Sequence, residues 1–470
     1  MSHNSTAVST TAHLVAMPWP GRGHINPMLN LCKLLLLASE TPPQLMITFV
    51  VTQEWRGFLS SETLPPNIRF GTLPQVIPSE IGRARDFHRF LEAALTKLQA
   101  PFEDLLDRLH PTPSAILYDT HLTWVTAVAE SRNIPVASLY PMSASVFTVF
   151  FHFDLLVQNG HYPADIAERG DERVDYIPGL PATTIGDLPS LFHGVGQKTM
   201  HRALEMASSA PNANYLLLTS LRELEPHVID GLKSKLSIPT YPIGPLIPYR
   251  NLTNPRSAAD EMYFQWLDSQ PESSVLYVSM GSFLSVSGAQ MEEIVAGIQD
   301  SGVRYMWVTR GDTSRFKEDD AAIGERAFLV PWCDQLKVLC HPSIGGFWTH
   351  CGWNSTWEGV YAGVPMLTYP IFWDQGPNSK MIVDDWKIGR RARKTVMWVE
   401  DVLTTREEIA ETVRRFMDLE SEERKEMVKR AKELQQVCKG AVAPGGSAAS
   451  NLDAFLKDIM THAVSQAPVS

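Results

Sequence analysis

A histidine follows a glycine-containing turn near the start of the chain, in the stretch AMPWPGRGHINPMLNL at 16–31. A strand-like apolar run ends in Pro20, and the apolar periodicity typical of a helix begins a few residues later. The pattern is similar to the phosphate turn of a dinucleotide-binding fold, but Asn26 occupies the position of that motif's third glycine. His24 is therefore either a remnant of a phosphate loop or the reactive group of a different site. An imidazole suits the second role because its pKa lies near neutral pH.

A denser group of polar and aromatic side chains lies between residues 332 and 375. In its middle, a predicted strand ends at His350, and Gly352 would allow a sharp turn there. Either Asn354 or Ser355 would cap the helix that follows. Backbone N–H groups and the dipole at such a helix start favour phosphate, and the side chains of His350 and Ser355 would add donors. The segment therefore predicts a site that fits a diphosphate.

Further side chains of the same segment extend this site. Glu358 lies one turn into the predicted helix, where its carboxylate could accept both hydroxyls of a ribose. Trp332 offers a flat face for a base. Asp374 and Gln375 follow the next strand and bring the acceptors and donors that sugar hydroxyls need. Taken singly, Trp332 is more often a core residue and Asn354 only a cap, but the ordered set outweighs these alternatives.

The elements that must position these groups follow from the alternation of strand and helix patterns. Near-continuous apolar strands, such as LMITFVV at 45–51 and SAILYD at 114–119, indicate parallel sheets covered on both faces. A proline-rich stretch at 241–256 interrupts the alternation, which resumes with SVLYVSMG at 274–281. We predict an α/β fold of two doubly wound, Rossmann-like domains facing across a cleft, with ligands at the carboxyl ends of the strands. The expected boundaries are an N-terminal domain at 1–243, a linker at 244–258, a C-terminal domain at 259–450, and a C-terminal helix and tail at 451–470 that packs back on the N-terminal domain.

Composition narrows the classes of partner. The net charge of −11 argues against nucleic acid or an anionic membrane and favours a small molecule. No stretch approaches the roughly 20 apolar residues that span a bilayer, and the first residues lack the charged region of a secretory signal. Five scattered cysteines suggest reduced thiols and a cytoplasmic location. A metal site is not expected at the crowded Cys333, Cys340, His341, His350 and Cys351. They contain no Cys-x2-Cys pair, and adjacent residues of a strand point to opposite faces.

The segment at 332–375 resembles, nearly position for position, the signature of plant UDP-sugar-dependent glycosyltransferases that act on small molecules. The matching positions are Trp332, Gln335, His341, His350, Gly352, Trp353, Asn354, Ser355, Glu358, Gly363, Pro365, Asp374 and Gln375. Similar stretches occur along the whole chain, including PIGPL at 242–246 and GGSAASNLDAF at 445–455. The resemblance implies the GT-B fold, an N-terminal domain that binds the acceptor, and a C-terminal domain that binds the UDP-sugar.

The resemblance also implies roles for individual residues. Trp332 would stack on uracil with Cys333 and Gln335 bonding nearby, and Glu358 would hold the ribose. Position 333 is often alanine or valine in the family, but the backbone of Cys333 can still serve. The phosphates would lie at the turn of Gly352 and be bound by His350, Asn354, Ser355 and Ser282, and the sugar by Trp353, Asp374 and Gln375.

In this family the histidine of the first-domain turn is the general base, which corresponds to His24. It would remove the proton of an acceptor hydroxyl while that oxygen attacks the anomeric carbon, so that the configuration inverts. The family's orienting aspartate corresponds to Asp119, although this residue could instead cap a helix beginning near Leu122. A dehydrogenase lacks support because no ribose-binding acid precedes Glu54, and a glycosidase because no opposed carboxylate pair is evident. A non-enzymatic UDP-sugar binder would not need the histidine and aspartate.

The substrates are expected to be a UDP-sugar and a small hydroxylated aglycone, with no cofactor and no metal. Segments 75–90, 140–153 and 180–200, which the family places at the acceptor, are rich in Phe, Met and Leu and favour an apolar phenolic or terpenoid acceptor. Ser143 and Phe147 are candidate contacts. Gln375 goes with glucose in the family, and the absence of arginine between 332 and 375 argues against glucuronate. We therefore expect UDP-glucose as donor, transfer to a hydroxyl or carboxyl group, and a monomeric enzyme.

Overall fold

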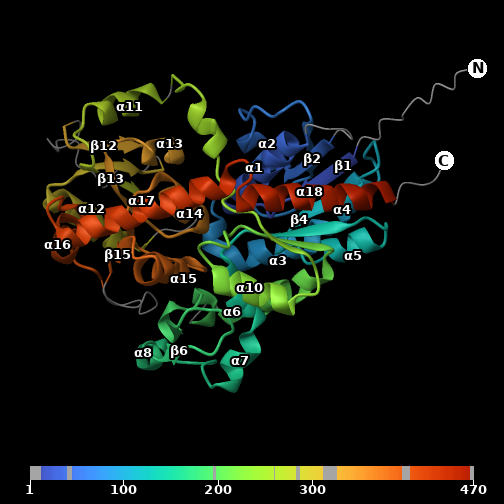
Figure 1. The fold of residues 1–470 in the computed structure, drawn as a ribbon, viewed down its shortest axis with the longest axis horizontal. Helices are drawn as coiled ribbons and strands as arrows, with labels where there is room; N and C mark the ends of the chain where they lie inside the picture. The colour runs from blue at the N-terminus through green and yellow to red at the C-terminus, as the bar shows by residue number, and fades with distance from the viewer. Residues whose placement is uncertain are drawn as a thin grey trace, which may run out of the picture. The chain divides into compact units, whose positions relative to one another are not determined.

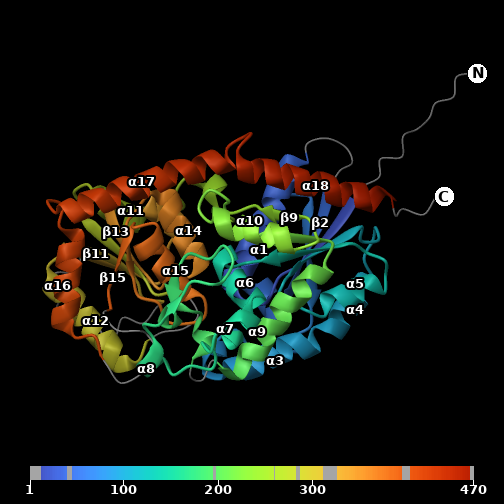
Figure 2. The same cartoon turned by 60° about the horizontal axis from the view of Figure 1, so that its bottom comes forward.

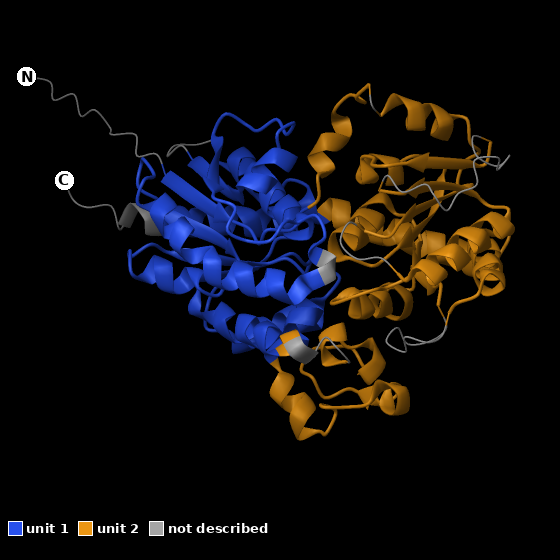
Figure 3. Ribbon diagram, turned by 180° about the vertical axis from the view of Figure 1, so that it is seen from behind, with its two compact units in different colours: residues 1–151, 201–246, 441–470 blue, residues 152–200, 247–440 orange. Residues whose placement is uncertain are grey.

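The chain forms two compact units, each built around its own parallel sheet (Figure 3). The computed structural model describes residues 12–39, 45–193, 197–258, 260–281, 286–310, 325–393 and 403–465. The first unit comprises residues 1–151, 201–246 and 441–470, and the second comprises 152–200 and 247–440. Among the described residues, no helix is long and apolar enough to cross a membrane.

The first unit holds a seven-stranded sheet in the order β3-β2-β1-β4-β5-β8-β9. Figure 1 labels β1, β2 and β4 of this sheet. Its strands are β1 Ala12–Met17, β2 Leu45–Thr52, β3 Ile68–Leu73, β4 Ala115–Asp119, β5 Val136–Tyr140, β8 Tyr215–Leu218 and β9 Thr240–Pro242. Its helices are α1 Arg22–Ala38, α2 Gln53–Phe58, α3 Phe87–Lys97, α4 Gln99–Leu106, α5 Val125–Glu130, α6 Ala144–Phe151, α9 Gln197–Ser209, α10 Pro226–Lys235 and α18 Ser447–Ser465. Helix α9 belongs to this unit from His201 onward. A 3-10 turn, η1, lies at Arg83–Asp86. All strand pairs in this sheet are parallel, as the continuous apolar strands predicted.

Both faces of this sheet are covered, and the alternation along β1 shows how. Leu14 and Ala16 belong to one core cluster with residues of α1 and α18, whereas Val15 and Met17 belong to another with residues of α3, α4 and α5. Successive side chains of a strand point to opposite faces, so a strand buried on both faces must be apolar throughout.

The second unit holds a six-stranded parallel sheet in the order β12-β11-β10-β13-β14-β15. Figure 2 labels β11, β13 and β15 of this sheet. Its strands are β10 Val275–Ser279, β11 Arg304–Val308, β12 Ala327–Val330, β13 Ile344–Thr349, β14 Met366–Thr368 and β15 Gly389–Arg391. Its helices are α7 Phe153–Gln158, α8 Ile166–Arg169, α11 Glu261–Asp268, α12 Gly288–Ser301, α13 Gln335–Leu339, α14 Trp353–Ala362, α15 Gln375–Lys380, α16 Arg406–Met417 and α17 Glu422–Val442. The last two residues of α17 belong to the first unit. A small antiparallel pair joins β6 Arg173–Val174 to β7 Thr183–Thr184. Two separate doubly wound sheets confirm the predicted α/β class.

The units divide the chain differently from the expected boundaries in two segments. Residues 441–450 were expected in the C-terminal domain but group with the first unit. Residues 152–200 were expected in the N-terminal domain but group with the second unit. Hydrogen bonds explain this grouping: the Ser190 N–H donates to the Trp373 carbonyl over 2.9 Å, and the Trp373 N–H donates to Ser190 Oγ over 2.7 Å. A pairing of Asp187 with Arg391 at 3.4 Å adds to them.

Helix α18 belongs to the core of the first unit although it lies at the far end of the sequence. Leu452, Phe455, Leu456 and Ile459 are buried in the same cluster as residues of α1, β1 and β2. The Tyr241 hydroxyl of β9 donates to the Asp458 carboxylate, and the Asn451 amide donates to the Pro242 carbonyl over 2.8 Å. The last segment therefore completes the apolar face of this sheet.

We expect Phe455→Ala to lower the free energy of unfolding by about 3–5 kcal/mol, because it leaves a cavity in a fully buried cluster. Lys457→Ala, on the exposed face of the same helix, should change it by less than about 0.5 kcal/mol. Urea unfolding followed by fluorescence measures both variants. Equal stability of the two would mean that α18 is not part of the core.

Candidate functional site

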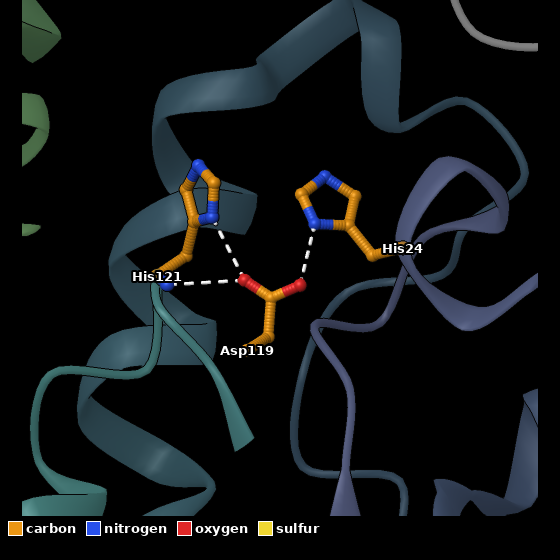
Figure 4. Close-up of side chains that lie close together, drawn as sticks. All are labelled: His24, Asp119 and His121. Atoms are coloured by element: carbon orange, nitrogen blue, oxygen red, sulfur yellow. Dashed lines mark hydrogen bonds and ion pairs between the residues drawn. The ribbon is translucent and has the colours of Figure 1, made fainter. Parts of the chain in front are cut away.

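The end of β4 and the turn after β1 meet in the first unit, because these parallel strands are neighbours in the sheet. His24 lies in the first turn of α1, and Asp119 is the last residue of β4. His24 Nδ1 lies 2.8 Å from Asp119 Oδ2 (Figure 4). The Asp119 side chain is 0% exposed, whereas that of His24 is 24% exposed. The two residues that were predicted from the sequence therefore form a hydrogen-bonded pair, in which the imidazole of His24 is partly exposed to solvent.

Burial and charge set the protonation of this pair. Burial alone would raise the pKa of Asp119, but the imidazoles of His24 and His121 hold the pKa of this carboxyl well below its usual range. Burial lowers the pKa of His24, and the opposing charge of Asp119 does not offset it fully. His24 is therefore neutral at pH 7. Because Asp119 can only accept, Nδ1 of His24 carries the proton and Nε2 keeps a lone pair, as a general base requires.

The alternative that Asp119 only caps a helix near Leu122 is wrong in this structure. The next helix, α5, begins at Val125, and its N-cap residue is Trp124. The Asp119 carboxylate instead accepts from the ring and the backbone N–H of His121, at 2.8 and 3.0 Å, besides His24. His121 was not predicted from the sequence as a residue of this site. A histidine two residues after an acidic strand end was the signal that could have identified it.

The two residues predicted to contact the acceptor, Ser143 and Phe147, have contacts within the first unit that account for their burial. Ser143 is fully buried, and its Oγ accepts from the Val146 N–H over 3.2 Å at the start of α6. Phe147 is also fully buried and packs against Tyr140 and Phe151, with ring centroids 5.0 and 5.8 Å apart. Contact of either side chain with an acceptor stays a prediction.

In the second unit, the turn between β13 and α14 differs in detail from the expected one. The left-handed residue is Cys351, with φ of 65°, while Gly352 has φ of −59° and is the N-cap residue of α14. Gly352 is needed for another reason: a Cβ there would lie 2.5 Å from Nε2 of His350. The expectation that Asn354 or Ser355 is the cap is wrong, since the N-cap position is held by Gly352, which has no side chain to bond to the first N–H groups. Such an uncapped start is suited to an anion.

His350 lies close to two glycines, because a Cβ on Gly281 would also clash with its Nε2. Burial, together with the charge of Arg310, lowers the pKa of His350 to about 4. The imidazole is therefore neutral at pH 7 and would offer a phosphate a hydrogen bond rather than a charge. Ser282, the other predicted phosphate ligand near this strand end, lies outside the described residues.

A hydrogen-bond network joins the residues predicted to hold the nucleoside. Tyr277 Oη donates to Gln335 Oε1 over 3.1 Å and lies 3.3 Å from Sγ of Cys333. Gln335 Nε2 donates to Ser355 Oγ over 2.9 Å and to the Glu358 carboxylate. Burial raises the pKa of Glu358 to about 7. The structure thus brings Cys333, Gln335, Ser355 and Glu358 together.

The two tryptophans of the segment have opposite environments. Trp332 is 63% exposed, so its indole face is open to a stacking partner. Trp353 is 3% exposed, and its ring packs against Trp357 and Trp386, with centroids 5.2 and 6.4 Å apart. Its predicted contact with the sugar can therefore involve its backbone but not its indole face.

Asp374 and Gln375 follow β14, as predicted, and their oxygens already have partners. Gln375 Oε1 accepts from the N–H groups of Ile371 and Phe372, at 2.7 and 2.9 Å. Asp374 Oδ2 accepts from the Asn378 amide over 2.8 Å. The interpretation that Gln375 both donates to and accepts from the sugar is therefore wrong for acceptance, because two donors use its carbonyl and only Nε2 remains to donate.

The cysteines and histidines weighed for a metal site do not form a cluster of three ligands in the part of the chain described. His341, for example, bonds to Ser343 Oγ and to the Asp268 carboxylate, both at 2.9 Å. Within the same described ranges, the group of three possible metal ligands that lie close together is His24, Asp119 and His121. In each histidine of this group, Nδ1 is engaged with the carboxylate of Asp119.

Comparison with known proteins identifies the family. Residues 241–421 match the model of the family described as UDP-glucoronosyl and UDP-glucosyl transferase. UDP-glycosyltransferase 87A2 of Arabidopsis thaliana is 51% identical over 98% of this chain and 99% of its own length. The chain belongs to the plant UDP-glycosyltransferases.

Solved structures of this family share the fold. Medicago truncatula UGT71G1 complexed with UDP-glucose is 25% identical with a TM-score of 0.79, covering 96% of this chain and 99% of that one. Phytolacca americana UGT2 complexed with UDP-2fluoro-glucose and pterostilbene is 25% identical with a TM-score of 0.77, covering 95% and 99%. The predicted GT-B fold and UDP-glycosyltransferase class are thereby confirmed, so the enzyme transfers a sugar from a UDP-sugar.

We expect Gly352→Ala to weaken UDP binding by about tenfold or more, since the new methyl group displaces the imidazole of His350 from the start of α14. Titration calorimetry with UDP measures the change. Gly440→Ala is the matched control, because a Cβ at that position in α17 meets nothing within 4 Å. Wild-type affinity in Gly352→Ala would show that the position of His350 does not matter for the nucleotide.

Proposed function

We propose that this UDP-glycosyltransferase is an inverting glucosyltransferase, with UDP-glucose as donor and a small apolar hydroxylated metabolite as acceptor. The general base is His24, oriented by Asp119. The observation that carries this proposal is the 2.8 Å hydrogen bond from His24 Nδ1 to the buried Asp119 carboxylate, which leaves Nε2 of a neutral imidazole to accept a proton.

The reaction is a single displacement. Nε2 of His24 takes the hydroxyl proton while the acceptor oxygen bonds to the anomeric carbon of glucose. The bond from that carbon to the β-phosphate oxygen breaks, and UDP leaves from the opposite face. The imidazolium that forms is stabilised by Asp119, which stays ionised because its pKa lies well below the usual range.

The donor is assigned to the second unit. The exposed Trp332 stacks on uracil beside Cys333 and Gln335, and Glu358 accepts from the ribose. The diphosphate lies at the start of α14, with His350 as a neutral donor. Nε2 of Gln375 and the carboxylate of Asp374 recognise the glucose hydroxyls. The complexes of Medicago truncatula UGT71G1 with UDP-glucose and of Phytolacca americana UGT2 with UDP-2fluoro-glucose support a glucosyl donor. No cofactor or metal enters the proposed reaction.

The acceptor is proposed to be a phenolic or terpenoid compound that offers a hydroxyl or a carboxyl group. The pterostilbene bound by Phytolacca americana UGT2 supports a small aglycone. The net charge of −11 supports a monomeric enzyme without nucleic-acid or membrane partners. The five free cysteines support a cytoplasmic location.

With an alcohol acceptor, His24→Ala should lower kcat by about two to four powers of ten, because the hydroxyl loses its base. Affinity for UDP-glucose should stay within about twofold, since the donor residues lie in the other unit. His227→Ala, an exposed histidine of the first unit, is the control and should retain wild-type turnover. A phenol assayed above pH 8 is avoided because its ionised form needs no base. Turnover of the alcohol retained by His24→Ala would contradict the role of His24.

Competition of three donors on one acceptor tests the sugar. UDP-glucose should exceed UDP-galactose and UDP-glucuronic acid by at least about tenfold in kcat/KM, because an inverted hydroxyl leaves a buried polar group unpaired. Gln375→Glu keeps an oxygen for the N–H groups of Ile371 and Phe372 but removes the Nε2 donor. This variant should bind UDP as before and UDP-glucose more weakly. Equal yields from all three donors would refute the donor assignment.

A further inference from the structure

The Asp119 carboxylate is shared between two imidazoles, one on each oxygen (Figure 4). Oδ2 accepts from His24 Nδ1, whereas Oδ1 accepts from His121 Nδ1 over 2.8 Å and from the His121 N–H over 3.0 Å. The two rings are close and nearly perpendicular, with centroids 5.0 Å apart at 82°. A base and its orienting carboxylate need one imidazole, so the second calls for an explanation.

We propose that His121 is a positioning residue, which holds the Asp119 carboxylate toward His24 and takes up part of its charge, and so sets the orientation and basicity of the base. This proposal rests on the proposed function, in which His24 is the base.

The exposure of the two rings separates their roles. The His121 side chain is 10% exposed, against 24% for His24, so solvent and acceptor reach His24 more readily. Both Nδ1 atoms must carry protons, because an ionised carboxylate only accepts. His121 is thus a donor fixed on Oδ1 rather than a second base.

The backbone around His121 is fixed by the sheet. The Thr120 N–H donates to the Leu139 carbonyl over 3.0 Å, and the Thr120 and Ser138 hydroxyls are 2.9 Å apart. The Leu122 N–H closes the turn on the Asp119 carbonyl over 2.8 Å. Trp19, which follows β1, packs against both imidazoles with centroids 6.4 and 5.9 Å away. The ring of His121 is therefore held on the carboxylate by a rigid turn.

The direction of the electrostatic effect follows from the charges that face His24. These are Asp119, His121 and Arg83 of η1, whose guanidinium is paired with Glu80 at 3.0 Å. Removing the ring donor from Oδ1 leaves more of the carboxylate charge on Oδ2. The imidazolium form of His24 is then favoured, so the pKa of His24 rises. As the pH is lowered, the neutral, active form of His24 is then protonated at a higher pH than in the wild type. The acidic limb of the rate profile therefore moves to higher pH.

The test compares His121→Phe, which keeps a ring but no donor, with His121→Asn, whose amide can donate from the position of Nδ1. His121→Ala repeats the donor-free case without the bulk of a ring. His13→Gln is the control for loss of a buried histidine, since His13 bonds to Pro111 and Thr48 rather than to Asp119. Two readouts are taken: the pH profile of kcat/KM with an alcohol acceptor, and titration of His24 by NMR in the resting enzyme, with carbon-13 in the 14 histidines.

In His121→Phe and His121→Ala, the acidic limb and the His24 titration should both move up by about half a pH unit or more. Both should return toward wild type in His121→Asn and stay unchanged in His13→Gln. In an Asp119→Asn background, His121→Phe should cause no further shift, because the effect passes through the carboxylate. Wild-type titration of His24 in both donor-free variants would overturn the proposal. If His24→Ala keeps its turnover, the proposed function fails, while the NMR titration still decides whether His121 acts on His24.

Discussion

The buried negative charge of Asp119 is the constraint on which the first unit's site depends. A carboxylate without exposure to water must find hydrogen-bond donors within the protein, since leaving it unpaired costs several kcal/mol, about the whole stability of a domain. The parallel sheet brings the turn after β1 beside the end of β4, so His24 can supply one donor. The turn after β4 supplies two more through His121. The hydrogen bond that satisfies the charge also fixes the tautomer of His24, which is the tautomer that the proposed general base needs.

Hydrogen bonds also stabilise two turns of the second unit whose backbone conformation is unfavourable. Cys351 and Trp373 both have positive φ, at 65° and 57°, and each precedes residues assigned to the donor. Such conformations cost about 1–3 kcal/mol for residues other than glycine. The Cys351 N–H donates to Thr349 Oγ1 over 3.0 Å, and the Cys351 carbonyl accepts from Asn378 over 2.9 Å. Ser190 bonds to both backbone groups of Trp373. Residues 152–200 thus help to shape the turn that carries Asp374 and Gln375.

Much of this could be predicted from the sequence, and the exceptions have physical causes. Continuous apolar strands require a sheet covered on both faces. A parallel sheet places the carboxyl ends of its strands at one edge, so the pairing of His24 with Asp119 could be predicted. The contact of His121 with Asp119 was missed, because a histidine in a loop carries no periodic signal and only its place two residues after the strand end points to it. The reason for Gly352 was predicted wrongly, since its need comes from the approach of His350, two residues earlier, and not from its own φ. The carbonyl of Gln375 is taken by backbone groups whose positions depend on the folded turn.

The number of hydrogen-bond donors around each carboxyl group explains why the pKa is lowered for Asp119 but raised for Glu358. Burial favours the neutral form of both Asp119 and Glu358. Asp119 has donors from His24 and His121 and stays ionised, whereas Glu358 has a hydrogen bond from Gln335 and a pKa of about 7. The ribose assigned to Glu358 would bring two hydroxyl donors. The fold itself therefore supplies the hydrogen-bond partners of Asp119, while the proposed UDP-sugar would supply those of Glu358, so that its binding would favour the ionised form of Glu358.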